Sequence, residues 1–212
     1  MTPGAFVRRV ARPLVWVGAA VPGTWLLLDA LTGGLGANPV ETVTHRTGLT
    51  ALTLLALSLS VRPTRDLLRF GALMPLRRTL GLAAYTYAVV HVLTYGVDQT
   101  YLSGLGVSPA AIVEDVRERP YVTMGFLAFV LLTPLAVTST SGWVKRLGAT
   151  RWRWLHRLVY LAAPLAVVHF LWLVKADLLL PGWFALAVAV LLGYRAVVRR
   201  RRTPTASSRL IL

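Results

Sequence analysis

Apolar residues gather into six long runs along the chain, separated by short stretches rich in charge, proline and glycine. A hydrocarbon core about 30 Å thick is crossed by roughly 20 helical residues, so runs of this length predict membrane-spanning helices. The pattern predicts an all-α protein built as a six-transmembrane-helix bundle. The expected spans are Pro13–Leu31, Pro39–Val61, Leu80–Val97, Tyr121–Thr138, Trp154–Val174 and Gly182–Val198.

The second run is the weakest of the six because Glu41, His45 and Arg46 occupy its first two turns. Its beginning is nevertheless typical of a helix start, with Asn38 as N-cap and Pro39 at the first helical position. We therefore keep this run as a span.

The longest connection between spans, residues 98–120, predicts a short amphipathic helix of its own. Ser108 and Pro109 are expected to start this helix, and Pro120 is expected to end it. An amphipathic helix between two spans is expected to lie at the membrane interface.

The composition agrees with a chain that lives in lipid. Of its 212 residues, 56% are hydrophobic, and its mean hydropathy of +0.62 is too high for a soluble domain of this length. Residues 1–202 are expected to form a single membrane domain, and the polar residues 203–212 a disordered tail.

The net charge of +15 is distributed asymmetrically between the two ends of the predicted spans. If both termini are cytoplasmic, 19 of the 23 lysine and arginine residues fall in cytoplasmic segments. Positive residues concentrate on the cytoplasmic side of membrane proteins, so this distribution predicts the orientation and an even number of spans. The basic charge is therefore a topology signal, and we expect membrane lipid and no nucleic acid as a partner.

Four histidines and no cysteine limit the metal chemistry of the chain to imidazole ligands. A buried imidazole in hydrocarbon is costly unless it is paired or bound to a metal. His91 lies 13 residues beyond Arg78, about 20 Å deeper from the inner side, and His169 lies 15 residues beyond Trp154, about 22 Å deeper. The two rings are therefore expected at one level, near the outer side, on antiparallel helices.

Two imidazoles at equal depth on facing helices are what a six-coordinate haem b needs as axial ligands. His91 and His169 are therefore candidate ligands of an outer haem. The alternative is a pair of buried histidines that hydrogen-bond to hydroxyl or carbonyl groups.

His156 lies near the inner side, about 20 Å before His169 along the helix axis, which suits a second haem stacked across the membrane. On a straight helix the two rings would point about 140° apart, and Pro164 between them can bend that segment. No histidine faces His156 from the third span, where Arg77 and Arg78 occupy the matching depth. The alternative for His156 is an interfacial histidine that makes a hydrogen bond.

Three further residues are candidates for contact with a cofactor. His45 begins the second span on the outer side, near the level of His91 and His169, where it would bind a haem or simply end a helix in the interface. Its neighbours Thr44, Arg46 and Thr47 would bond to haem propionates. Arg77 and Arg78 belong to an inner basic rim that would attract propionates or a flavin phosphate. The alternative is that both arginines serve topology alone.

Several motifs occur together and in order, and they resemble the haem-binding membrane subunit of the bacterial periplasmic protein–methionine-sulfoxide reductase system, in the ferric-reductase-like transmembrane family. The resemblance covers residues 38–175. Its motifs are Asn38-Pro39-Val40-Glu41, Thr44-His45-Arg46-Thr47-Gly48, Arg77-Arg78-x-Leu80-Gly81-Leu82, Arg119-Pro120-Tyr121-Val122-Thr123-x-Gly125, Leu135-Ala136-Val137-Thr138-Ser139-Thr140, Trp152-x-x-Leu155-His156-Arg157-Leu158-Val159-Tyr160 and His169-Phe170-Leu171-Trp172-x-Val174-Lys175.

The resemblance implies a non-catalytic electron carrier of the bacterial cytoplasmic (inner) membrane. It implies electrons from the quinone pool or a cytosolic flavin reductase, and a periplasmic molybdenum-containing methionine-sulfoxide reductase catalytic subunit as acceptor. It also implies haem b as a cofactor, one or two per chain, with His91, His156 and His169 as ligands, and FMN. The third span carries one histidine where the wider family carries two, which leaves the number of haems open.

Three alternatives follow from the same residues. One is a ferric reductase or b-type cytochrome with another acceptor. The second, from a different class, is a small-solute transporter that uses buried histidines as proton relays. The third is a purely structural subunit.

Overall fold

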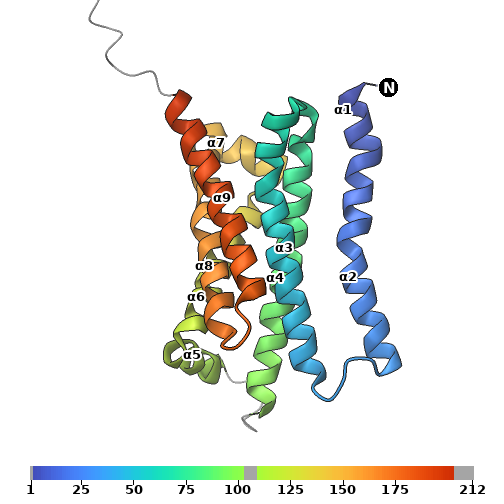
Figure 1. Ribbon diagram of the computed structural model, residues 1–212, viewed down its shortest axis with the longest axis vertical. Coiled ribbons are helices and arrows are strands. Elements are labelled where there is room, and N and C mark those ends of the chain that lie inside the picture. The colour runs from blue at the N-terminus through green and yellow to red at the C-terminus, as the bar shows by residue number, and fades with distance from the viewer. Residues whose placement is uncertain (1, 103–108, 203–212) are drawn as a thin grey trace, which may run out of the picture.

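The protein consists of helices that run lengthwise beside one another. The computed structural model describes residues 2–102 and 109–202, and no strand occurs in those ranges. Both ends of the described chain lie at the same end of the bundle (Figure 1). The all-α prediction is confirmed. The tail predicted for residues 203–212 lies outside the described residues.

Six long helices make up the bundle in the described part of the chain, and shorter elements connect them. The long helices are α2 (Arg12–Thr32), α3 (Pro39–Leu68), α4 (Met74–Leu102), α6 (Pro120–Val137), α8 (Val159–Leu173) and α9 (Leu179–Arg202). The shorter elements are α1 (Pro3–Phe6) and η1 (Val7–Ala11), which lead into α2, and η2 (Gly71–Leu73), α5 (Pro109–Glu118), α7 (Ser141–Leu155) and η3 (His156–Leu158).

Five segments of the described chain are long and apolar enough to cross a membrane, and they overlap five of the six predicted spans to within one residue at their ends. They are Pro3–Thr32, Gly71–Asp98, Pro120–Val137, Ser141–Leu173 and Leu179–Arg200. The remaining long helix, α3, has 30 residues, or about 45 Å of length, and it packs along α4. Charged residues in its first and last turns make α3 less apolar than the five segments above. It is the run that the sequence marked as the weakest of the six.

Two local predictions at helix starts are confirmed. The Asn38 side chain accepts a hydrogen bond from the Glu41 backbone N–H at 3.3 Å, so it caps α3 directly before Pro39. The short helix expected in the longest connection is α5, which lies at the end of the bundle opposite the termini (Figure 1).

The predicted span Trp154–Val174 is wrong at its beginning. The chain forms α7 up to Leu155, then a 3-10 turn at His156–Leu158, and only then α8. The break therefore lies ahead of Pro164, and His156 is not on the same straight helix as His169. The angle of about 140° expected between the two rings does not apply, because it assumed an unbroken helix.

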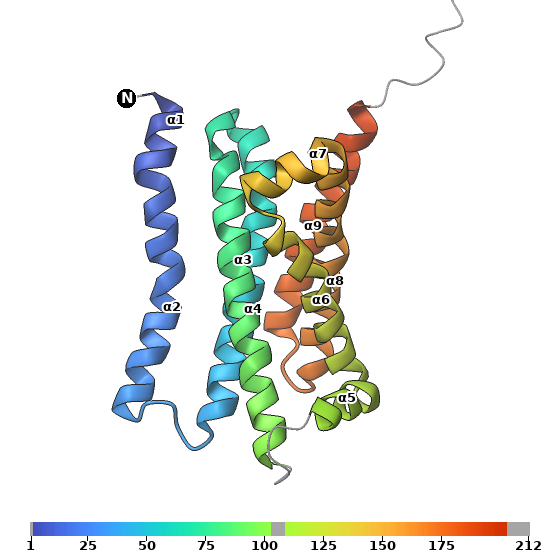
Figure 2. The same cartoon turned by 180° about the vertical axis from the view of Figure 1, so that it is seen from behind.

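Helix α7 itself was not expected from the sequence. Its mixture of tryptophans with basic residues has no long apolar run of its own, so the hydropathy pattern does not predict it. Gly148 has φ +72° and ψ 153°, a backbone conformation open to glycine, and it interrupts the helix. The helix lies across the end of the bundle that carries the termini (Figure 2).

The interior is built by two helix pairs, α3 with α4 and α6 with α8. Leu52, Leu55 and Leu59 of α3 are buried against small residues of the other helices. Ala84 and Ala163 are almost fully buried, and their small side chains let helix backbones approach closely, as in other membrane bundles.

Helix α2 lies at the edge of the bundle and packs mainly against α4 (Figures 1 and 2). Its large apolar side chains face outward: Trp25 is 65% exposed and Leu31 is 75% exposed. The Tyr87 hydroxyl of α4 donates to the Ala19 carbonyl of α2 at 2.7 Å and accepts from the Gly23 N–H at 2.8 Å. This hydroxyl thus sits between a carbonyl and an N–H that normally bond each other within a helix.

Candidate haem-binding site

The imidazoles of His91 and His169 meet inside the bundle. Their ring centroids lie 6.1 Å apart, and the ring planes are inclined by 74°. His91 belongs to α4 and His169 to α8, so each of the two helix pairs contributes one ring. The structure therefore brings together the two histidines that their depths predicted at one level.

The His91 ring is held by the neighbouring helix α3. Its Nδ1–H donates to the Thr44 carbonyl oxygen at 2.8 Å. The ring lies against Gly48, where an added Cβ would come within 2.9 Å of ring atoms Cε1 and Nδ1. Only a residue without a side chain leaves the ring this position.

The His169 ring is held by α6 in the same manner. Its Nδ1–H donates to the Tyr121 carbonyl oxygen at 2.7 Å. A Cβ at Gly125 would lie 2.8 Å from this Nδ1. The Tyr121 ring also stacks on the imidazole, with centroids 6.3 Å apart and planes inclined by 27°.

These two hydrogen bonds fix the chemistry of both rings. A carbonyl oxygen only accepts, so Nδ1 must carry the proton in each histidine. In the neutral ring the lone pair is then on Nε2, which is the form that binds a metal. A backbone carbonyl as partner of the second ring nitrogen is the usual way in which proteins orient a histidine ligand.

The geometry fits a haem iron between the two rings. Metal–imidazole bonds of about 2 Å each, together with the short distance from each nitrogen to its ring centre, amount to about 6 Å between centroids. The observed separation of 6.1 Å agrees with this value. In the part of the chain that the structure describes, no cluster of three or more potential metal ligands occurs. A haem iron needs only the two axial imidazoles, because the porphyrin supplies its other ligands.

Comparison with known proteins identifies the family. Residues 47–167 match the family described as "Ferric reductase like transmembrane component". The chain is 50% identical to a protein of Deinococcus radiodurans over 78% of this chain and 79% of that one. It is 44% identical to a protein of Rhodospirillum rubrum over 98% and 100%, and 43% identical to one of Ralstonia nicotianae over 88% and 85%. All three are named "Protein-methionine-sulfoxide reductase heme-binding subunit MsrQ".

The chain belongs to this MsrQ family. Together with its long apolar helices, the membership makes it a multi-pass membrane protein. The range matched to the ferric-reductase family contains His91, Gly48 and Gly125, and it ends two residues before His169.

In this family member His156 lies at the other end of the bundle and has a different environment. Its Nδ1–H donates to the Trp152 carbonyl at 3.1 Å, and its ring stacks on the Trp152 indole with centroids 3.9 Å apart. Nε2 is buried and has no hydrogen-bond partner in the described residues. The Leu135 backbone is near enough to act on it electrostatically but does not meet hydrogen-bond geometry.

Of the three remaining candidates, only His45 lies near the His91–His169 pair, close enough for its charge to act on His91. His45 is exposed on α3, and Arg78 is exposed on α4. Arg77 donates to the Tyr160 hydroxyl at 3.2 Å at the end of the bundle that carries the termini. Both arginines therefore lie at the opposite end from the histidine pair.

The residues that hold the two rings were not predicted from the sequence. They are Gly48 and Gly125, and the carbonyls of Thr44 and Tyr121. One signal was available. Glycine inside a helix costs about 1 kcal/mol relative to alanine, so a helical glycine asks for a packing reason. Each of these glycines follows its carbonyl partner by four residues, which is about one helical turn.

Proposed function

We propose that the chain binds haem b between His91 and His169 and serves as the electron-carrying membrane subunit of a protein–methionine-sulfoxide reductase. The observation that carries this proposal is the meeting of two imidazoles, 6.1 Å apart, whose Nδ1 atoms are both engaged by carbonyls. The printed name of the relatives, a heme-binding subunit, supports it. When bound, haem b supplies one-electron redox chemistry.

The protein residues have three tasks in this function. The carbonyls of Thr44 and Tyr121 hold the proton on Nδ1 and so direct the Nε2 lone pairs. Gly48 and Gly125 give the rings room beside the neighbouring helices. With both imidazoles bound to it, a haem iron would have no position left for oxygen, which would favour electron transfer.

We further propose six spans, with α3 as the sixth, both termini in the cytoplasm, and residence in the bacterial inner membrane. The shared end of the termini and the basic residues of α7 and α9 support this orientation. The histidine pair would then lie nearer the periplasmic side, and His156 nearer the cytoplasm.

Electrons would enter from the quinone pool or a cytosolic flavin reductase and leave to a periplasmic molybdenum-containing catalytic subunit. Reduction of one methionine sulfoxide to the thioether and water consumes a pair of electrons and a pair of protons. His156 offers one imidazole for an inner haem, supported by its buried, unpaired Nε2. FMN as a second cofactor rests on the family resemblance alone.

The test is a spectroscopic and functional assay of the purified full-length chain. We expect a red protein with a low-spin b-type spectrum. After chemical reduction, its spectrum should return to the oxidised form only when the molybdenum-containing partner and an oxidised protein substrate are both added. A colourless protein would contradict the proposal and favour a transporter or a structural subunit. A red protein whose reoxidation ignores the partner would favour a cytochrome with another acceptor.

A further inference from the structure

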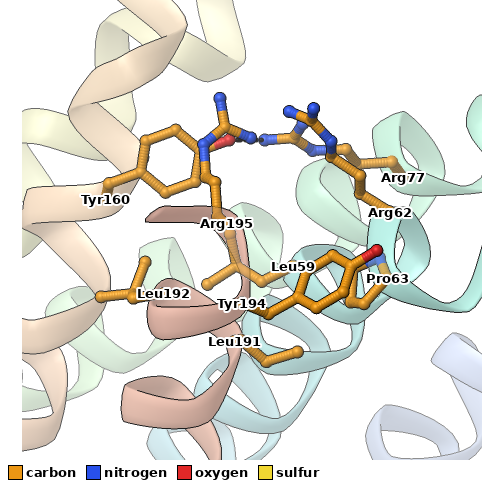
Figure 3. A pocket seen from close by; sticks show the side chains of 9 residues that line it. All are labelled: Leu59, Arg62, Pro63, Arg77, Tyr160, Leu191, Leu192, Tyr194 and Arg195. Carbon is orange, nitrogen blue, oxygen red and sulfur yellow. Dashed lines mark hydrogen bonds between the residues drawn. The ribbon is translucent and has the colours of Figure 1, made fainter. Parts of the chain in front are cut away.

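A cavity lies between α3, α4, α8 and α9, toward the end of the bundle that carries the termini. Its side chains leave about 10 Å³ of free space, about enough for one water molecule (Figure 3). One wall is basic and another is apolar. The basic side chains are Arg62, Arg77 and Arg195, and the apolar ones include Leu59, Leu191 and Leu192.

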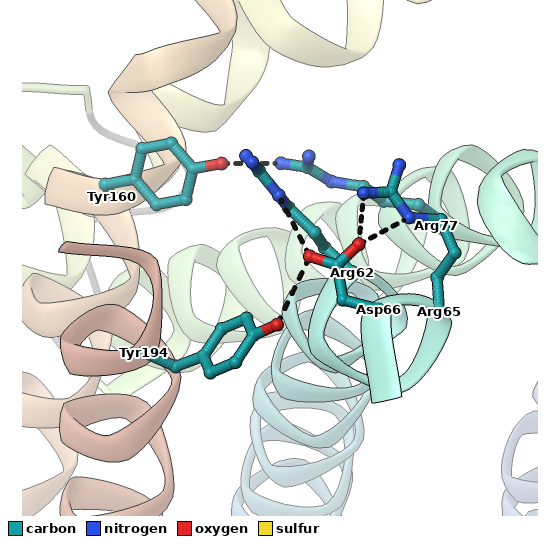
Figure 4. A network of polar contacts seen from close by, with 6 residues as sticks. All are labelled: Arg62, Arg65, Asp66, Arg77, Tyr160 and Tyr194. Atoms are coloured by element: carbon teal, nitrogen blue, oxygen red, sulfur yellow. Dashed lines mark hydrogen bonds and ion pairs between the residues drawn. The ribbon is translucent and has the colours of Figure 1, made fainter. Parts of the chain in front are cut away.

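One carboxylate, that of Asp66, partly balances the arginines near this cavity. It accepts hydrogen bonds from Arg65 and, at 3.2 Å, from the Tyr194 hydroxyl (Figure 4). It also pairs with Arg62, whose Nε lies 3.9 Å away. The negative charge of Asp66 is therefore neutralised by Arg62 and Arg65, both on α3.

Arg77 and Arg195 have no such counter-charge. Arg77 donates to the Tyr160 hydroxyl at 3.2 Å, and the Arg195 guanidinium lies over the Tyr160 ring, 3.9 Å from its centroid. Within residues 2–102 and 109–202, neither of them forms an ion pair with a carboxylate. The charges of Arg62 and Arg77 moreover repel that of Arg195.

Converging positive charges that are half-buried are unfavourable unless an anion joins them, because the low local dielectric strengthens their repulsion. Guanidinium groups match the oxygens of a phosphate, to which they donate pairs of hydrogen bonds. Tyr160 meanwhile holds both guanidinium groups in place, one by its hydroxyl and one by its ring. The two guanidinium groups are therefore positioned to bind an oxyanion.

We propose that the guanidinium groups of Arg77 and Arg195 bind the phosphate of an anionic membrane lipid at the edge of this cavity. Basic pockets between membrane helices on the cytoplasmic side are typical sites for such headgroups. The free space of about 10 Å³ is too small for a flavin or a porphyrin, so the phosphate is held by the guanidinium groups at the edge of the cavity. The proposal needs the chain to lie in a membrane, and it does not depend on haem binding.

The test measures lipid retention by the haem-loaded, full-length protein. Protein reconstituted into nanodiscs of mixed phosphatidylglycerol and phosphatidylcholine is transferred to detergent, and native mass spectrometry identifies what stays bound. We expect one retained phosphatidylglycerol. The double variant Arg77→Gln/Arg195→Gln should weaken this retention about 25-fold, as about fivefold per arginine.

Arg9→Gln is the matched control, because Arg9 is an exposed arginine at the same end of the bundle. If the double variant does not fold, the single variants carry the test, each with a loss of about fivefold. Equal retention of phosphatidylcholine, a loss no greater than that of Arg9→Gln, or a bound mass of FMN in place of lipid would each overturn the proposal. Loss of lipid with an unchanged haem spectrum supports it.

Discussion

The two ends of the bundle hold their histidines in different ways. His91 and His169 donate to carbonyls of neighbouring helices, and each ring fills the space left by a glycine of that neighbour. His156 makes both of its contacts with Trp152, four residues earlier in the chain: it donates to the Trp152 carbonyl and stacks on the Trp152 ring. The first arrangement requires two packed helix pairs, whereas the second is local.

This difference teaches which site depends on tertiary structure. At the histidine pair, a ring moves whenever α3 shifts against α4, or α6 against α8, since the carbonyl and the glycine lie on the partner helix. At His156 the same shifts leave the hydrogen bond and the stacked ring intact. The His91–His169 pair is therefore a site with two potential ligands that depends on helix packing. His156 is a single potential ligand, and no second imidazole faces it.

The largest effect is expected from removing either ligand of the pair. His91→Ala and His169→Ala should each abolish the outer haem, because one imidazole alone does not make the six-coordinate iron. The haem-to-protein ratio and the low-spin absorption band measure this. Leu186→Ala, a change at an outward-facing position on α9, controls for expression and membrane insertion. If both histidine variants kept the full band, the assignment of these ligands would be wrong.

A smaller effect is expected from the glycines that seat the rings. Gly48→Ala and Gly125→Ala put a methyl group 2.9 Å and 2.8 Å from ring atoms, so the imidazoles must turn away from their carbonyl partners. Disturbing such supporting contacts typically weakens metal binding about 10–100-fold, and haem titration of the apoprotein measures it.

Two other helical glycines provide the control for that comparison. A Cβ at Gly18 or Gly193 meets nothing within 4 Å, so Gly18→Ala and Gly193→Ala should bind haem as the unchanged protein does. Equal haem affinity in all four variants would show that the rings tolerate displacement, and the argument for a built site would fail.

The smallest effect on the outer haem is expected from His156→Ala. Because His156 contacts neither ring of the pair, the low-spin band of the outer haem should persist in full. Total haem should fall by up to about half, if an inner haem depends on this ligand. Difference spectra of the two proteins at equal concentration measure both quantities. Loss of the outer band in this variant would mean that the two ends of the bundle are coupled.

The sequence was sufficient for the features that depend on one segment at a time. Long apolar runs predict their helices because each must satisfy its own backbone hydrogen bonds in lipid. The common level of His91 and His169 followed from counting residues at 1.5 Å each. Both results need no knowledge of which helix packs on which.

Features that depend on packing partners escaped prediction. That Gly48 faces His91, and not another residue of α4, follows from the register of two helices, which hydropathy does not encode. Tyr160 of α8 accepts a hydrogen bond from Arg77 of α4 and lies under the guanidinium of Arg195 of α9. These contacts too depend on the register of neighbouring helices. Helix α7 was missed for a different reason, since a basic helix that lies across the bundle has no long apolar run.

The Tyr87 hydroxyl fixes the height of the outermost helix. Sliding α2 along α4 would break both hydrogen bonds of the Tyr87 hydroxyl, and in hydrocarbon no water is present to replace them. This hydroxyl thus joins α2 to α4, while the ion pair of Asp29 with Arg46 joins α2 to α3. Tyr87 lies one helical turn before His91 on α4. The position of α2 along the bundle axis is therefore coupled to the turn that carries His91, a candidate haem ligand.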